Sequence, residues 1–160
     1  MSKKKRVVSL FLSILQIKAI KNIELDDEHK KFITGVAPED GDLIAGDFIY
    51  DNIKYSFIDG CSSILGVHRI SCNFTFEVKS DTSISSIEKH INNFNLYRIG
   101  IKASFISLEK ETLKVQFSID FISYSDGSFL SKDRIINSLD LLDSSAEYLW
   151  GSAKEIMKDK

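Results

Sequence analysis

Residues 68–79 read HRISCNFTFEVK, and this stretch decides the fold class of the chain. Every second residue from Ile70 to Val78 is apolar, and each residue between them is polar. Successive side chains of a strand point to opposite faces, so the pattern predicts a half-buried strand with one apolar face and one polar face. The chain is therefore expected to build a sheet that other elements cover on one side.

Upstream of this strand, the same period of two marks a hairpin. Residues 47–50 and 53–58 predict two short strands, and the Asp51-Asn52 pair between them is typical of hairpin turns. Because hairpin strands are antiparallel neighbours, this pair is expected to extend the sheet.

Two further alternating stretches predict a second antiparallel hairpin. Alternate apolar residues from Ile99 to Phe105 share one face of its first strand, and those from Leu113 to Phe121 share one face of its second. The polar residues 109–112 form the turn between them. A shift of either strand by one residue would expose all of its apolar side chains, so the register is expected to be strongly fixed.

Three segments show the 3-and-4 spacing of helices. The apolar residues within 7–20 predict an N-terminal helix. Ser85 and Glu88 have the spacing of a capping box, which predicts a short helix that ends near residue 95. The longest pattern covers residues 131–158, and its first residue, a serine, is the expected N-cap.

Together these patterns predict an α+β fold in the order α-β-β-β-α-β-β-α. The helices are expected to pack on one face of a five-stranded antiparallel sheet. The 160 residues, of which 43% are hydrophobic, are long enough to form a single domain with a real core. Within it, residues 1–44 would supply the N-terminal helix and a connector, and residues 45–160 the sheet with two helices.

Charge and cysteine content narrow the classes of function. The formal net charge is −2 and the positive charge gathers in the run Lys3–Arg6, so no basic face for nucleic acid is expected. The apolar stretch that follows is too short to span a bilayer and lacks a small-residue cleavage site, which favours a retained helix over a signal peptide. The two cysteines make no disulfide framework and favour a cytoplasmic location.

The chain shows no spacing that is typical of a catalytic or cofactor site. Phosphate-binding glycine loops and nucleophile elbows are absent. Cys61, His68 and Cys72 lie within twelve residues, but they lack the close pairs of a zinc site. His90 has no acid or nucleophile tied to it by spacing. We therefore predict a protein that is not an enzyme, with no catalytic residues, no cofactor and no metal.

Residues 91–95 read INNFN and run into YRIGIKA at 97–103, where a helix is expected to end and a strand to begin. This string, with the order of elements over about residues 45–157, resembles the YbjN-type family, which shares a fold with the chaperones of type III secretion effectors. The resemblance implies a small, mildly acidic, dimeric protein that binds other polypeptides against apolar patches and an exposed sheet. It carries over no catalytic residue.

The first functional hypothesis is a non-catalytic protein-binding module, chaperone-like or regulatory. It would hold a partner polypeptide on its sheet or on an apolar helix surface. The partner is another protein or a second copy in a homodimer, and neither nucleic acid nor a membrane span is involved. The expected partner-binding residues are Phe11, Leu15, Tyr50, Tyr55, Phe57 and Trp150.

The alternative hypothesis is a small-ligand-binding or enzymatic α+β domain. A curved sheet under a long C-terminal helix can enclose a pocket between the two. The pocket would be lined by Phe74, Phe76, Phe105, Phe117 and Phe121. A packed core uses the same residues, and we favour it over a pocket.

Overall fold

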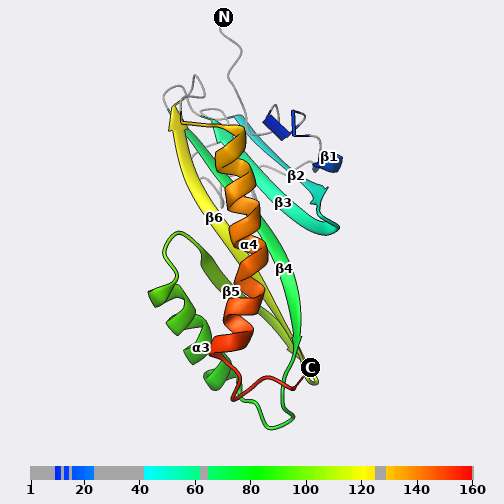
Figure 1. Cartoon of the computed structure of the whole chain (residues 1–160), viewed down its shortest axis with the longest axis vertical. Helices are drawn as coiled ribbons and strands as arrows, with labels where there is room; N and C mark the ends of the chain where they lie inside the picture. The colour runs from blue at the N-terminus through cyan, green and yellow to red at the C-terminus, as the bar shows by residue number, and fades with distance from the viewer. Residues whose placement is uncertain are drawn as a thin grey trace, which may run out of the picture. The chain divides into compact units, whose positions relative to one another are not determined.

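The computed structural model describes residues 10, 11, 13, 14, 16–23, 42–61, 65–124 and 129–159, and Figure 1 draws their elements. The strands form one antiparallel sheet in the order β1-β2-β3-β4-β6-β5, so the described part has six strands where five were expected. The predicted α+β class is confirmed. The elements in chain order are β1 (Lys18–Ile23), β2 (Asp42–Tyr50), β3 (Ile53–Cys61), β4 (Leu65–Glu77), α3 (Ile84–Tyr97), β5 (Lys102–Glu109), β6 (Thr112–Tyr124) and α4 (Lys132–Ser152).

The sixth strand, β1, overlaps the segment where an N-terminal helix was expected. Of the described residues before it, only Leu10 and Phe11 are helical, and the chain is a strand from Lys18 onward. β1 pairs antiparallel with β2 and forms one edge of the sheet. The helical prediction is wrong here because apolar spacing shows only which side chains are buried. It does not show whether a neighbouring strand is present to form backbone hydrogen bonds.

The pairing of β1 with β2 depends on a close backbone approach at Gly46. A Cβ atom at Gly46 would lie 2.1 Å from the carbonyl oxygen of Lys21 and 2.7 Å from the Phe57 ring. Only glycine leaves this space open. β1 also contains an irregularity between Lys18 and Lys21, where Ala19 adopts a positive φ of 53°. Such a bulge interrupts the alternation that would mark a strand in the sequence.

The predicted hairpin of β2 and β3 is confirmed and is longer than expected. The two strands pair in register along their whole length. Asp51 and Asn52 have φ values of 47° and 65°, so both turn residues adopt the left-handed conformation. A two-residue turn of this hand matches the twist of antiparallel strands, and Asp and Asn tolerate it better than most residues.

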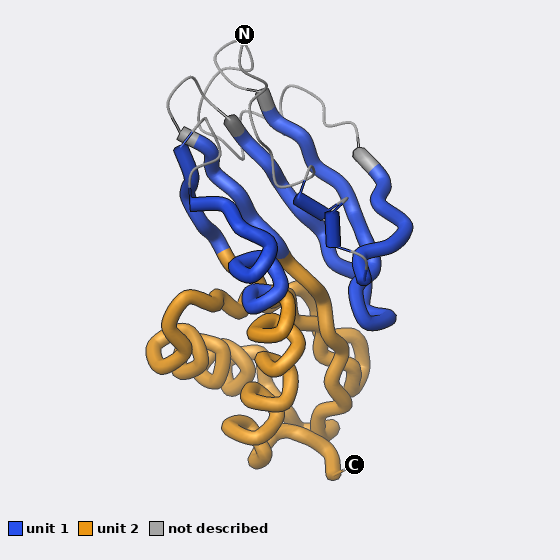
Figure 2. The backbone as a smooth tube through the Cα atoms, turned by 45° about the horizontal axis from the view of Figure 1, so that its top comes forward, with its two compact units in different colours: residues 1–70, 120–138 blue, residues 71–119, 139–160 orange. Residues whose placement is uncertain are grey.

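The chain divides into two compact units, which Figure 2 colours separately. Unit 1 comprises residues 1–70 and 120–138, and unit 2 comprises residues 71–119 and 139–160. β4, β6 and α4 each contribute residues to both units. The expectation of a single domain stays a prediction.

Aromatic rings form the core of unit 1. The ring of Phe11 lies 4.5 Å from that of Phe48 and 5.3 Å from that of Phe57, measured between centroids. Tyr55 stacks on Phe48 at 5.4 Å. Phe48, Tyr55 and Phe57 occupy inward positions of paired strands, so strand alternation and register bring them together.

The core of unit 2 joins its helices to β6. Phe94 of α3 lies 5.3 Å from Phe117 of β6 and 5.7 Å from Tyr148 of α4, measured between ring centroids. Ile87 and Ile91 are buried on the same side of α3 as Phe94. Their spacing of four and seven residues along the helix places all three on one face.

α3 and α4 each begin at a serine cap. Ser131 accepts a hydrogen bond from the backbone N–H of Arg134 at 3.1 Å, as predicted for α4. The cap of α3 is Ser83, whose hydroxyl accepts from the backbone N–H of Ser86, and not Ser85 as the capping-box spacing suggested. Several capping residues follow one another in this stretch, so spacing alone does not select among them.

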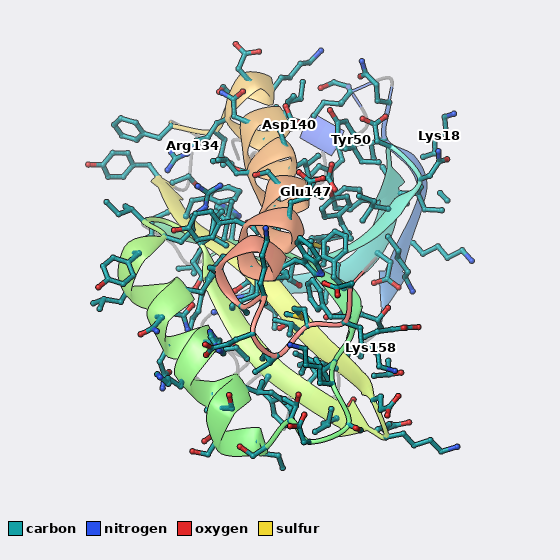
Figure 3. All side chains as sticks on the ribbon, turned by 60° about the horizontal axis from the view of Figure 1, so that its bottom comes forward. Lys18, Tyr50, Arg134, Asp140, Glu147 and Lys158 are labelled. Atoms are coloured by element: carbon teal, nitrogen blue, oxygen red, sulfur yellow. The ribbon has the colours of Figure 1, made fainter. Side chains whose placement is uncertain are left out.

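The chain beyond α4 leaves the helix, although helical spacing continues to residue 158. Met157 forms an antiparallel bridge with Val78, just after β4. Lys158, labelled in Figure 3, forms an ion pair with Glu111 of the β5–β6 turn. The apolar residues of this tail are buried against the sheet, so the burial was predicted correctly and the backbone conformation was not.

Candidate functional site

Three polar side chains lie in a row in unit 1, one on each of the neighbouring strands β3, β4 and β6. His68 Nδ1 lies 2.9 Å from Asp59 Oδ1, and His68 Nε2 lies 2.8 Å from Ser123 Oγ. The side chains of Asp59, His68 and Ser123 are 0%, 1% and 2% exposed. We call these three residues the buried Asp-His-Ser array.

Strand alternation places the array on the inner face of the sheet. Asp59 follows the buried Phe57 by two residues, His68 precedes the buried Ile70 by two, and Ser123 follows Phe121 by two. The ring of His68 also packs on Phe121, with 5.3 Å between centroids. On each of the three strands, the polar residue of the array thus follows or precedes a buried apolar residue on the same face.

Gly66 provides the room in which the array is held. A Cβ atom at this position would lie 2.6 Å from Ser123 Oγ and 2.7 Å from His68 Nε2. Both distances are far inside van der Waals contact, so a side chain at Gly66 would displace the hydrogen bond between His68 and Ser123. The sequence marks Gly66 only as the residue before a strand.

The order carboxylate, imidazole, hydroxyl is the order in which an oriented histidine activates a serine nucleophile. The one hydroxyl hydrogen of Ser123 is donated to the carbonyl oxygen of Tyr124 at 3.1 Å, so it is not at the same time available for donation to His68. With an exposure of 2%, this hydroxyl has no surface to offer a substrate. Asp59 Oδ2 has no hydrogen-bond partner among the described residues, so His68 is the group that satisfies this carboxylate. The array therefore joins three strands of the core.

Sequence reasoning missed the array because its members are distant along the chain. His68 is 9 residues from Asp59 and 55 residues from Ser123. A local motif cannot relate such positions. The one available signal was a polar residue at an inward position of each strand, and this signal becomes visible only once the strand order is known.

Four of the six residues expected to bind a partner are buried in unit 1. Phe11, Tyr55 and Phe57 are at most 1% exposed in the aromatic core of unit 1, and Tyr50 is buried beside Tyr55. Trp150 is half-buried in unit 2, with Lys154 Nζ 5.4 Å from its ring centroid. Leu15 lies outside the described residues. The role of these residues in partner binding stays a prediction.

Of the two cysteines, Cys72 is buried with a free thiol. Burial, together with the smaller effect of the negative charge of Asp143, raises the pKa of the Cys72 thiol to about 12. A thiol that stays protonated is a poor nucleophile and a poor metal ligand. Within the described ranges, no three His, Cys, Asp or Glu side chains are grouped so as to hold a metal ion.

Of the phenylalanines of the expected pocket, Phe74, Phe117 and Phe121 pack against other aromatic rings. Phe117 contacts Phe74 in unit 2, with 6.0 Å between centroids. In unit 1, the guanidinium of Arg134 lies 5.4 Å from the centroid of Phe121; Figure 3 labels Arg134 near the beginning of α4. Phe76 is buried and Phe105 is half-buried.

The end of α3 exposes apolar side chains on unit 2. Leu96 and Tyr97 are each 71% exposed, and Ile99 is 96% exposed. Alternation placed Ile99 on the apolar face of a strand, but β5 begins only at Lys102 and Ile99 lies in the turn before it. We call Leu96, Tyr97 and Ile99 the α3–β5 turn patch.

Asn95 braces the turn against β5. Its Oδ1 accepts a hydrogen bond from the backbone N–H of Ala103 at 2.7 Å, and its Nδ2 donates to the carbonyl oxygen of Ala103 at 2.9 Å. β5 is the edge strand of the sheet, so one side-chain amide pairs backbone groups that face away from β6. Asn95 itself is helical, so it acts on β5 through its side chain.

Arg98 holds the same turn against α4. Its backbone N–H donates to the carbonyl oxygen of Phe94 at 2.8 Å. Its guanidinium lies 4.9 Å from the ring centroid of Tyr148 and donates to Ser144 Oγ at 3.3 Å. Tyr148 is partly exposed, and its contact with Arg98 places it beside the turn.

Comparisons with known proteins inform the fold alone. No family model and no curated protein matches the chain. A protein of unknown function from Methanothermobacter thermautotrophicus has a crystal structure that covers 93% of this chain and 94% of its own, at 15% identity and a TM-score of 0.50. The crystal structure of YbjN from E. coli, described as a proposed transcription regulator, covers 72% of this chain and 81% of its own, at 7% identity and a TM-score of 0.40.

No helix in the described ranges combines the length and apolar character that crossing a membrane requires.

Proposed function

We propose that the protein is a non-catalytic protein-binding module, chaperone-like or regulatory, that holds a partner polypeptide on the α3–β5 turn patch. The observation that carries this proposal is the exposure of Ile99, 96%, beside Leu96 and Tyr97 on a turn that Asn95 and Arg98 brace. Contiguous exposed apolar side chains mark interaction sites. Because the turn is already ordered, binding costs little conformational entropy.

The chemistry of the patch favours an apolar or aromatic peptide segment. The guanidinium of Arg98 is engaged with Tyr148 and Ser144. Asn95 occupies the edge of β5 at Ala103, where an added strand would otherwise bind. Recognition by side-chain contacts is therefore favoured over extension of the sheet at this position.

The resemblance to the YbjN-type family is part of the same proposal and rests on residues 91–103. In support, the string INNFN lies near the end of α3 and Asn95 within it bonds to β5. We also propose a cytoplasmic location, which the free thiol of Cys72 supports, since a reducing compartment maintains free thiols.

The test measures the binding of labelled peptides by fluorescence anisotropy. A panel of peptides rich in Leu, Phe and Val is titrated with the wild-type protein, with Tyr97→Asp/Ile99→Asp, and with Ile84→Asp. Ile84 is a matched control, because it is 52% exposed at the opposite end of the same helix. We expect the double variant to bind at least about 10-fold more weakly and the control to bind as the wild type does.

Equal weakening in the control and the double variant would show that the patch is not the site. Failure of every peptide to bind the wild type below about 1 mM would remove the proposal. Affinity capture from the source cells then identifies the partner, and a partner that binds the wild type must be lost from Tyr97→Asp/Ile99→Asp.

A second candidate function, acyl transfer at Ser123, is favoured by the geometry of the buried Asp-His-Ser array. It would require an opening that brings the Ser123 hydroxyl to the surface. A fluorophosphonate probe tests it under native conditions. Labelling that is lost in both Ser123→Ala and His68→Ala would establish an activated serine, and no labelling of the wild type is expected if the protein is non-catalytic.

A further inference from the structure

The outer face of the sheet in unit 1 carries exposed apolar residues next to an ion pair. Val67 of β4 is 56% exposed, and Ile122 and Tyr124 of β6 are 58% and 51% exposed. Arg69 and Asp120, on the same two strands, form an ion pair at one end of this apolar surface. All five alternate with inward residues, so they share the face opposite the buried array. We call these five residues the outer β4–β6 face.

The ion pair on this face is bidentate. Arg69 Nε donates to Asp120 Oδ1 at 2.6 Å and Arg69 Nη2 donates to Asp120 Oδ2 at 2.7 Å. These two bonds leave further N–H groups on the guanidinium and further lone pairs on the carboxylate. The pair is therefore neutral as a whole and still able to bond to a second pair of the same kind.

The outer β4–β6 face of one copy is complementary to the same face of a second copy, both in charge and in the position of its apolar residues. β4 and β6 run antiparallel, so Val67 and Ile122 lie two residues from the ion pair in the same direction along the sheet. Consider two copies whose outer β4–β6 faces meet, with a two-fold axis that runs between the faces, parallel to the strands and midway between β4 and β6. This axis places Arg69 of one copy over Asp120 of the other. The same operation places Val67 of one copy over Ile122 of the other.

We propose that two copies of the chain associate through the outer β4–β6 face about this two-fold axis. Closed two-fold pairing is the commonest form of self-association, and it uses one surface patch on both copies. The charge complementarity identifies a second copy as the occupant, because each Arg69–Asp120 pair meets the same pair in opposite orientation. This association goes beyond the proposed peptide binding and uses the other unit.

The test is analytical ultracentrifugation of the full chain over about 1 μM to 1 mM. The wild type is expected to dimerise within this range. Arg69→Glu makes the face acidic and Asp120→Arg makes it basic, so each single variant is expected to dimerise at least about 10-fold more weakly. An equimolar mixture of the two variants is expected to form a 1:1 heterodimer, because each now supplies the charge that the other lacks.

Two further variants identify the surface. Ile122→Glu is expected to weaken the dimer at least about 10-fold, and Ile84→Glu, a matched exposed isoleucine on unit 2, is expected to leave it unchanged. A wild type that stays monomeric up to about 1 mM overturns the proposal. So does a dimer that resists Ile122→Glu, or a mixture of the charge variants that stays monomeric. Tyr97→Asp/Ile99→Asp, which tests peptide binding, must leave the dimer intact, so each proposal can fail alone.

Discussion

Removing the imidazole of His68 should destabilise the protein more than any exposed ion-pair variant. In the wild type, Asp59 Oδ1 bonds to His68 at 2.9 Å, and Asp59 Oδ2 has no partner among the described residues. His68→Leu therefore leaves a carboxylate with 0% exposure and no described partner. Loss of one member of a buried hydrogen-bonded pair costs about 3–5 kcal/mol of unfolding free energy, because the remaining polar group stays buried without a partner.

The double variant Asp59→Leu/His68→Leu separates the cost of leaving Asp59 buried without its partner from the cost of lost side-chain packing. It removes both polar groups, and Ser123 keeps its hydrogen bond to the carbonyl oxygen of Tyr124. Replacing both partners of a buried polar pair by apolar groups is often close to neutral. We expect the double variant to be more stable than His68→Leu alone, although it carries one more substitution.

Urea unfolding followed by circular dichroism and by Trp150 fluorescence measures these differences as shifts of the midpoint at constant slope. Lys54→Ala is the control, because Lys54 is exposed and its Nζ pairs with Asp47 Oδ2 at 2.7 Å. Its expected cost is at most about 1 kcal/mol. A His68→Leu variant that loses less than about 1 kcal/mol, or a double variant that loses the sum of the two single losses, would refute the reasoning.

Three further outcomes are expected. Gly66→Ala should lower the unfolding free energy by about 1–3 kcal/mol, because its Cβ would collide with Ser123 and His68. Gly151→Ala, whose Cβ meets nothing within 4 Å, should raise the unfolding free energy by about 0.5–1 kcal/mol. Urea titrations that give the same sign for both variants would contradict the packing argument. Asn95→Ala removes two hydrogen bonds to the β5 edge and should cost about 1–3 kcal/mol, with faster amide exchange at the edge as the local readout. In a Cys61→Ser background, the raised pKa of Cys72, about 12, should keep its thiol unreactive toward iodoacetamide at pH 8 until urea unfolds the chain; rapid native alkylation would show that this thiol is accessible.

Alternating and helical spacing predicted most of the elements, because burial of apolar side chains is what those periods report. The strand at residues 68–79 and the hairpin turn at Asp51 and Asn52 were found in this way. β1 was not, because its pairing depends on a bulge at Ala19 and on the space at Gly46. Ile99 was assigned to the buried face of a strand for a different reason: periodicity does not show where a strand begins.

The sequence by itself determined the α+β class, the positions of the two helices, the inward face of β6 and the absence of a local catalytic motif. These properties depend on short-range spacing, which any stretch of chain carries within itself. Only the tertiary structure decided that Asp59, His68 and Ser123 meet, and that Arg69 pairs with Asp120 on the opposite face. Such contacts depend on which strands become neighbours. Strand order is a property of the whole sheet, and no local pattern encodes it.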